Sequence, residues 1–244
     1  MKLKKLLAGL VSAAMVMSTM IMPAFADDGT VREVSTAADL KTAFAAAQTG
    51  DTVKLTEDIT VNEQIDIKNP AALKGITLDG NGKTINAQLH TSSGGGSPLY
   101  FGNADEKLYC TGISIRNLTI NGEARFGIFL CGGTSSTLEN VNISGKFLYA
   151  ANFYGTHGAT LTNCNISNSN NEGVNNEFGA AVWSNVASAN PLKLINTKIS
   201  SIAINKYTAA NTLAPKIYVD KDSSTEIRTL DDGSVSKTRL MCLD

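Results

Sequence analysis

One short pattern occurs four times between residues 113 and 199, and this repetition constrains the fold more than any other feature of the chain. Each copy has an Ile or Leu two residues before an Asn and an Ile three residues after it. The repeated asparagines are Asn117, Asn140, Asn163 and Asn196, at intervals of 23, 23 and 33 residues. A period of this length is typical of repeat proteins, in which a repeat buries its apolar face only by stacking on its neighbours.

Apolar and polar residues alternate on both sides of each Asn, which is the two-residue period of a β-strand. In the first copy the apolar positions are Ile113, Ile115, Leu118 and Ile120, and a third alternating run follows from Phe126. Coils built from three such strands can stack at the ~4.8 Å strand spacing and enclose one continuous core. The sequence therefore predicts an all-β fold, a parallel β-helix.

The repeated asparagines are predicted to be structural. In a stack of coils the Asn of one coil lies above the Asn of the next, so the amide side chains can form a hydrogen-bonded ladder. We expect this ladder to comprise Asn117, Asn140, Asn163 and Asn196. The same register places these side chains, and that of Cys164, toward the interior.

Residues 1 to 26 are predicted to be a secretory signal peptide. Three lysines precede an apolar run from residue 6 to residue 22, and Ala-Phe-Ala stands before residue 27. No second apolar span reaches the ~20 residues that a membrane helix needs. We therefore expect a secreted or cell-surface protein with no transmembrane segment after signal cleavage.

The rest of the chain is predicted to form one domain with short flanking segments. These parts are an N-terminal segment at 27–35, the β-helix domain at 36–230 and a C-terminal tail at 231–244. Within the domain, Thr36 and Asp39 resemble a capping box, and Leu40 and Phe44 continue at helical spacing. We expect a short helix over residues 36–49 that covers the open end of the first coil.

Charge and composition exclude several classes of partner. The whole chain has 21 basic and 22 acidic residues, and three of the basic ones lie in the signal peptide. An acidic mature chain argues against a nucleic-acid partner.

The Gly-rich stretch 87–107 lacks the GxxxxGK[ST] spacing of a phosphate loop, and His90 and His157 are too few for a metal site. We expect no cofactor and no metal.

Two segments carry a resemblance to a known family. They are Gly50-Asp-Thr-Val-Lys-Leu55 and Ile76-Thr-Leu-Asp-Gly-Asn-Gly-Lys-Thr-Ile85, taken with the Ala-rich helix and the repeats. This combination resembles the secreted bacterial proteins of the pectate-lyase-like superfamily, over most of residues 34–205. The resemblance implies a right-handed β-helix. It also implies polysaccharide cleavage as an activity, although many unrelated functions share this scaffold.

Cleavage of that kind needs carboxylates on the outer face of neighbouring coils. Lyases of the superfamily hold calcium with clustered carboxylates and use a basic residue, and the hydrolases use paired acids. The outward positions of the four copies carry one carboxylate, Glu139, which lies beside Arg116. His157 has no carboxylate near it, and His90 lies in the Gly-rich loop. We therefore predict no catalytic residue.

Carbohydrate binding by aromatic stacking is the alternative to cleavage. Trp183 and Tyr154 are the best-placed aromatics, at corresponding ends of the third run of their coils. Asn171, Glu172 and Glu177 lie in the longest insertion between repeats, where they could hydrogen-bond sugar hydroxyls. The structural alternative is that Trp183 packs over a coil edge and the polar insertion is a solvated loop.

Two of the four cysteines could form a disulfide. Cys110 and Cys131 are 21 residues apart, near one coil length, and a bridge closing that loop would contribute ~3 kcal/mol. Cys164 takes an inward position and is interpreted as a small core residue. Cys242 lies in the C-terminal tail.

The sequence leaves three functions open. The leading hypothesis is a secreted or cell-surface β-helix, without catalytic activity, that serves adhesion or carbohydrate binding. Its partner would be an extracellular polysaccharide or a host or cell-surface glycan. The second is a polysaccharide lyase or glycoside hydrolase acting on pectin-like polymers, with its site at Asp105 and Glu106 or at Glu172 and Glu177. The third is a structural surface spacer.

Overall fold

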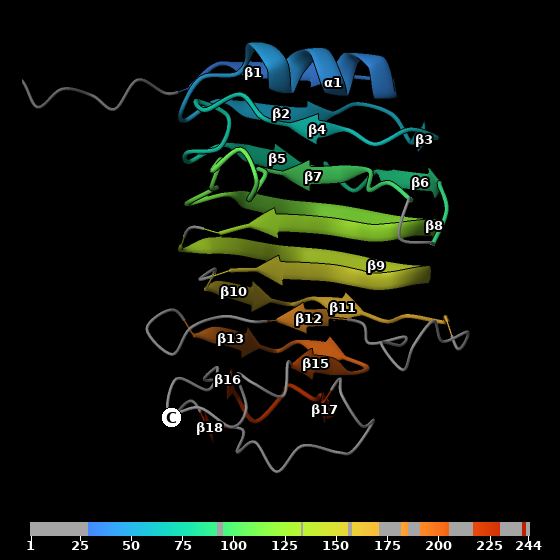
Figure 1. Cartoon of the computed structure of the whole chain (residues 1–244), viewed down its shortest axis with the longest axis vertical. Helices are drawn as coiled ribbons and strands as arrows, with labels where there is room; N and C mark the ends of the chain where they lie inside the picture. The colour runs from blue at the N-terminus through green and yellow to red at the C-terminus, as the bar shows by residue number, and fades with distance from the viewer. Residues whose placement is uncertain are drawn as a thin grey trace, which may run out of the picture.

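The computed structural model is a stack of coils that runs from a helix at the N-terminal end to short strands at the C-terminal end (Figure 1). It describes residues 29–91, 95–132, 134–155, 158–170, 182–184, 191–204, 217–229 and 241–242. Every pairing between the named strands of these residues is parallel. The predicted all-β parallel β-helix is therefore confirmed.

Strands make up most of the described chain, with one helix, α1 (Ala37–Ala46). The strands are β1 (Val31–Val34), β2 (Thr52–Leu55), β3 (Ile59–Val61), β4 (Asp66–Ile67), β5 (Thr77–Asp79), β6 (Thr84–Gln88), β7 (Leu99–Phe101), β8 (Ser114–Cys131), β9 (Ser136–Tyr154), β10 (Ala159–Thr162), β11 (Asn165–Ile166), β12 (Val182–Ser184), β13 (Leu192–Ile195), β14 (Lys198–Ile199), β15 (Ile202–Ile204), β16 (Ile217–Val219), β17 (Ile227–Thr229) and β18 (Met241–Cys242). Strands β8 and β9 each continue along all three sides of a coil without a break.

The strands form three faces, each a parallel sheet built from successive coils. The first face holds β1, β2, β5, the starts of β8 and β9, β10, β13, β16 and β18. The second holds β3, β6, the middles of β8 and β9, β11 and β14. The third holds β4, β7, the ends of β8 and β9, β12, β15 and β17.

Inward columns of apolar side chains fill the space between the faces. On the first face, Leu78, Ile115, Leu138 and Leu161 lie in register on four neighbouring coils, and each is fully buried. Because the side-chain period of a strand is two, the residues between them point outward. The repeat pattern therefore sets both the core and the outer surface.

The repeated asparagines form the corner between the first and second faces. All four have a positive φ, from 44° at Asn196 to 54° at Asn163, and Asn is one of the few residues that adopt this left-handed conformation readily. Asn140 Nδ2 donates to Asn117 Oδ1 at 3.1 Å, and Asn196 Nδ2 donates to Asn163 Oδ1 at 2.8 Å. The expectation that the asparagines point inward is wrong. The left-handed turn places them at the surface, and three of the four are exposed.

Helix α1 closes the N-terminal end of the stack (Figure 1). Thr36 is its N-cap, and the Thr36 Oγ1 accepts a hydrogen bond from the Asp39 amide at 3.1 Å, as the sequence predicts. Leu40 and Phe44 are buried beneath the helix. The Phe44 ring meets the Phe101 ring edge-on, with centroids 5.5 Å apart.

A buried carboxylate joins the helix to the first two strands. Asp51 accepts hydrogen bonds from the Thr30 amide at 2.8 Å, the Gln48 amide at 2.9 Å and the Arg32 Nε at 2.9 Å. Burial disfavours the charged form, but the amides of Gln48 and Thr30 and the Arg32 guanidinium outweigh it and lower the pKa of Asp51. Asp51 is therefore an ionised structural anchor.

The solenoid extends beyond the range 36–230 expected for the β-helix domain. Strand β1, within residues 27–35, pairs with β2, and β18, within residues 231–244, pairs with β16. The predicted signal peptide lies outside the described residues. In the part of the chain that the structure describes, the helix α1 is neither long enough nor apolar enough to cross a membrane.

Candidate functional site

The outer side of the first face carries a column of charges whose sign alternates from coil to coil. Successive coils place Glu33, Lys54, Asp79, Arg116 and Glu139 in register. Lys54 Nζ lies 3.6 Å from Glu33 Oε1, and Arg116 Nε lies 3.0 Å from Asp79 Oδ2. Opposite charges on neighbouring strands stabilise each other, and charged side chains keep a sheet surface solvated.

This column does not suit the paired acids of a glycoside hydrolase. A cation lies between successive carboxylates of the column, so their strands are two coils apart, ~9.6 Å at the ~4.8 Å strand spacing. This spacing is at the upper end of the ~5–9.5 Å that separates paired acids, and the cation between them neutralises both. Burial opposes ionisation of Asp79, but the Asn81 amide, the Asn117 side chain and Arg116 together lower the pKa of Asp79. A general acid needs a raised pKa instead.

Of the other carboxylates considered for catalysis, the structure describes Asp105 and Glu106. Glu106 lies in the turn after β7, where its Oε1 is 2.6 Å from Lys68 Nζ and 3.2 Å from Asn103 Nδ2. The neighbouring Asp105 is exposed. Glu106 thus forms a surface ion pair with Lys68. Residues 171–181, which include Glu172 and Glu177, lie outside the described residues, as does His157.

Aromatic rings gather on the outer side of the third face. We define this outer aromatic cluster as Tyr100, Phe126, Phe129, Tyr149 and Tyr154. The Phe129 ring is central: its centroid lies 4.1 Å from that of Tyr100, 5.4 Å from that of Phe126 and 5.9 Å from that of Tyr154. Phe126 stacks in turn on Tyr149, with centroids 6.1 Å apart. The cluster is separate from the main core.

A corner in the coil turns two of these rings outward. A Cβ at Gly127 would come within 3.2 Å of the core atom Ile143 Cγ2, so this position points inward. Its neighbour Phe126 belongs to the outer aromatic cluster. On the next coil, Ala150 packs in the main core while Tyr149 lies outside it. The alternation in the sequence would place Phe126 and Ile128 on the same side of the strand, so it does not reveal that Phe126 lies outside the main core and Ile128 inside it.

Two tyrosines at one edge of the outer aromatic cluster are exposed to solvent. Tyr154, at the end of β9, is 39% exposed, and Tyr109, before β8, is 51% exposed. Both contact Gly132: its amide donates to the Tyr154 carbonyl at 2.7 Å, and a Cβ there would come 2.4 Å from Tyr109 Cδ1. Gly132 thus lies beside the backbone of Tyr154 and beside the ring of Tyr109.

A buried polar atom lies in the outward column of the third face. Asn152 is in register with Phe129 on one side and with Trp183 on the other. Asn152 is 5% exposed, and its Oδ1 accepts no hydrogen bond from the described residues. The structure places Trp183 opposite Asn152, two positions before the level of Tyr154, and describes only the backbone there. Trp183 and Tyr154 are therefore in the same sheet but in different columns.

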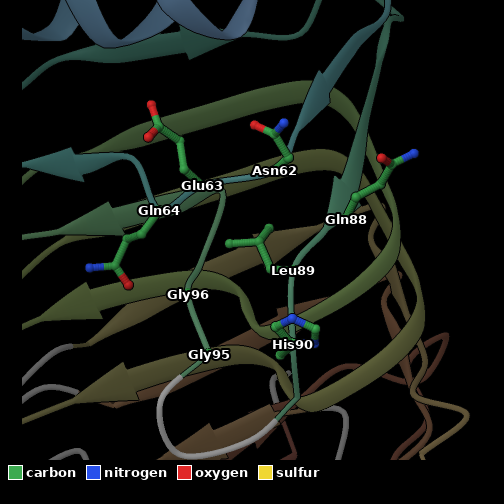
Figure 2. A pocket seen from close by; sticks show the side chains of 8 residues that line it. All are labelled: Asn62, Glu63, Gln64, Gln88, Leu89, His90, Gly95 and Gly96. Carbon is green, nitrogen blue, oxygen red and sulfur yellow. The ribbon is translucent and has the colours of Figure 1, made fainter.

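A polar cleft of about 390 Å³ opens near the N-terminal end of the solenoid. Its lining residues are Asn62, Glu63, Gln64, Gln88, Leu89, His90, Gly95 and Gly96. Figure 2 shows the turn after β3 on one side, the segment after β6 on the other, and Leu89 pointing into the space between them. The cleft was not foreseen, because its two walls are more than 20 residues apart in the sequence and neither contains a recognised motif.

A family model described as a putative pectate lyase-like adhesive domain matches residues 31–213. The chain belongs to this adhesive-domain family. Comparison with curated proteins and with solved structures gives no match. The family confirms the resemblance inferred from the repeats and supports a surface β-helix with an adhesive role.

The cysteines of the adhesive domain are thiols where the structure describes them. The Cys110 amide donates to the Cys131 carbonyl at 3.0 Å, so the two lie on adjacent coils, as expected. Cys110 packs in the main core, however, whereas Cys131 packs outside it with Phe126 and Phe129, and the possible bridge is not formed in the structure. Burial raises the pKa of Cys110 to about 12 and the pKa values of Cys131 and Cys164 to about 11, so none is a nucleophile near neutral pH.

The described residues contain no group of three or more His, Cys, Asp and Glu side chains that could hold a metal ion. Of the ligand-binding residues expected for the adhesive domain, Tyr154 is exposed and Trp183 is placed by its backbone alone. Asn171, Glu172 and Glu177 lie outside the described residues. Of this expected set, Tyr154 is thus the residue whose side chain the structure describes.

Proposed function

We propose that this adhesive domain is a secreted or cell-surface β-helix that binds glycans without cleaving them. The observation that carries the proposal is the outer aromatic cluster, where a stack of rings ends in the exposed Tyr154. A tyrosine offers an apolar ring face and a polar hydroxyl, and a sugar ring offers an apolar face edged with hydroxyls. Tyrosine is also enriched among residues that dominate binding energies.

The stacking partners make Tyr154 suitable for this role. Its ring lies against Phe129, which in turn lies against Tyr100, so its position is supported by packing. A supported ring loses little conformational entropy when a ligand binds.

Binding of the purified protein to insoluble polysaccharides and to a glycan array tests the proposal. We expect Tyr154→Ala to weaken binding about tenfold or more, because the stacking surface is lost. Tyr154→Phe keeps the ring and should bind like the wild type within a few fold. Tyr218→Ala, on the first face, is the matched control.

Two results would contradict this proposal. One is that the wild-type protein retains no glycan on the array or the polysaccharides, which would favour a structural spacer. The other is binding that Tyr154→Ala leaves unchanged, which would move the glycan site away from the outer aromatic cluster.

A further inference from the structure

We propose that the polar cleft is a second binding site, for a single uncharged sugar unit, and that it acts independently of the outer aromatic cluster. Its volume of about 390 Å³ falls within the range of ~300–1,000 Å³ that is typical of small-molecule sites. It lies between the second and third faces, on the coils nearest to α1.

Backbone hydrogen bonds to neighbouring strands fix the walls of the cleft. The Leu89 amide donates to the Glu123 carbonyl at 2.8 Å, and the Arg125 amide donates to the Gly96 carbonyl at 2.9 Å, so β8 holds both ends of one wall. The Ile65 amide donates to the Ser97 carbonyl at 3.1 Å and ties the opposite wall to the first. The cleft is therefore preformed where its residues are described.

The lining chemistry matches the hydroxyl groups of a sugar. Three carboxamides line the cleft, from Asn62, Gln64 and Gln88, and a carboxamide can both donate and accept hydrogen bonds. Gln64 Nε2 already donates to Asp66 Oδ1 at 2.7 Å, which leaves its Oε1 and second N–H for a ligand. His90 adds a ring nitrogen of either kind. A sugar hydroxyl is likewise both donor and acceptor, and Leu89 supplies an apolar contact for a ring face.

The charges around the cleft argue against ionic ligands. Lys and Arg are absent from its lining, so a phosphate or sulfate would lack a cationic partner. Glu63 is the one carboxylate, and its Oε1 lies 3.4 Å from Lys41 Nζ. Calcium prefers six to eight oxygen ligands that include several carboxylates. An uncharged ligand remains as the best match.

Gly96 keeps the two walls at their present separation. A Cβ at this position would come within 2.6 Å of Leu89 Cδ2 and 2.9 Å of Gln64 Cβ. A methyl group would therefore have to displace Leu89 or Gln64, one from each wall. Gly96→Ala is thus a variant that changes the shape of the cleft while it leaves every polar lining group in place.

The test is backbone-amide NMR of the full protein, titrated separately with free glucose, galactose and N-acetylglucosamine. At least one of these sugars is expected to shift the amides around residues 62–64 and 88–90 with millimolar affinity. We expect Gln88→Ala and His90→Ala to weaken binding of that sugar about tenfold, the effect of losing ~1.4 kcal/mol. Gln48→Ala, an exposed glutamine at the end of α1, is the matched control and should bind like the wild type. Calcium chloride and inorganic phosphate serve as the ionic probes.

The proposal fails if none of the three sugars shifts these amides, or if Gly96→Ala, Gln88→Ala and His90→Ala all bind with unchanged affinity while folded. Shifts around the cleft with calcium or phosphate alone would overturn the assignment of an uncharged ligand. Tyr154→Ala separates this result from the glycan binding proposed above, because it should leave the cleft shifts intact.

Discussion

Individual residues hold the corners of the solenoid. Asn117, Asn140, Asn163 and Asn196 each turn the chain from the first face to the second with a positive φ, which L-residues with a Cβ disfavour. Their side chains also form hydrogen bonds between coils, from Asn140 to Asn117 and from Asn196 to Asn163. The side-chain Nδ2 of Asn117 donates to Asp79 Oδ1 at 3.3 Å. The need for a positive φ explains the recurrence of Asn at this corner better than the side-chain hydrogen bonds do, because exposed hydrogen bonds add little stability.

Replacement of Asn140 separates conformation from hydrogen bonding. We expect Asn140→Ala to lower the free energy of unfolding by ~1–2 kcal/mol, since alanine resists the left-handed turn. Asn140→Gly removes the same side chain but accepts the turn, and it should cost less. Urea titration of both variants measures the difference. Equal losses in the two variants would show that the side-chain bond, rather than the backbone conformation, sets the cost.

The lowered pKa of Asp51 should make the free energy of unfolding depend on pH. Its pKa is lowered in the folded protein, so its contribution is complete above the unfolded value of ~3.9 and is lost as the pH falls through the lower folded value. Asp51→Asn should remove this part of the acid sensitivity and cost ~1–3 kcal/mol at neutral pH. Unfolding curves between pH 2 and pH 7 are the measurement. Asp105→Asn, at an exposed site, is the control, and an equal change in both variants would contradict the assignment.

Among the elements, α1 has the clearest structural task. A coil at the end of a solenoid exposes its apolar cross-section and unpaired strand edges, and α1 covers the N-terminal one with Leu40 and Phe44. The sequence predicted this helix well because Thr36 and Asp39 mark its start locally and the apolar spacing marks its buried side.

Truncation of Phe44, which α1 packs onto the first coils, should expose the N-terminal end of the solenoid. We expect Phe44→Ala to lower the free energy of unfolding by ~3–5 kcal/mol, because it leaves a cavity against Phe101. The uncovered edge should also promote concentration-dependent self-association. Thermal unfolding and analytical ultracentrifugation measure the two effects. Lys41→Ala, on the exposed side of the same helix, should show neither, and a stable monomeric Phe44→Ala would contradict a capping role.

The proposed binding sites were less predictable from the sequence than the fold. The register of the first face followed from alternation around each Asn, since one buried side fixes every side chain of a strand. The outer aromatic cluster did not follow, because the corner at Gly127 moves Phe126 and Tyr149 to the outside and no local signal marks that corner. The polar cleft likewise depends on which loops meet when coils of unequal length stack.

At the scale of the whole molecule, two features of the outer surface support the proposed binding role. The described first face presents charges of alternating sign, and the third face presents stacked rings that end in the exposed Tyr154. Paired acids with a raised pKa, which glycoside hydrolysis requires, are missing from these described columns. The adhesive-domain family is consistent with this surface.

One measurement tests the central claim most directly. The purified protein is incubated with pectin and with each polysaccharide that it retains, and bound protein and released sugar ends are measured in the same sample. We expect retention of protein on at least one polysaccharide, weakened by Tyr154→Ala, with no unsaturated or reducing ends released above a protein-free control. Release of such ends by the wild-type protein would contradict the account and identify the domain as an enzyme.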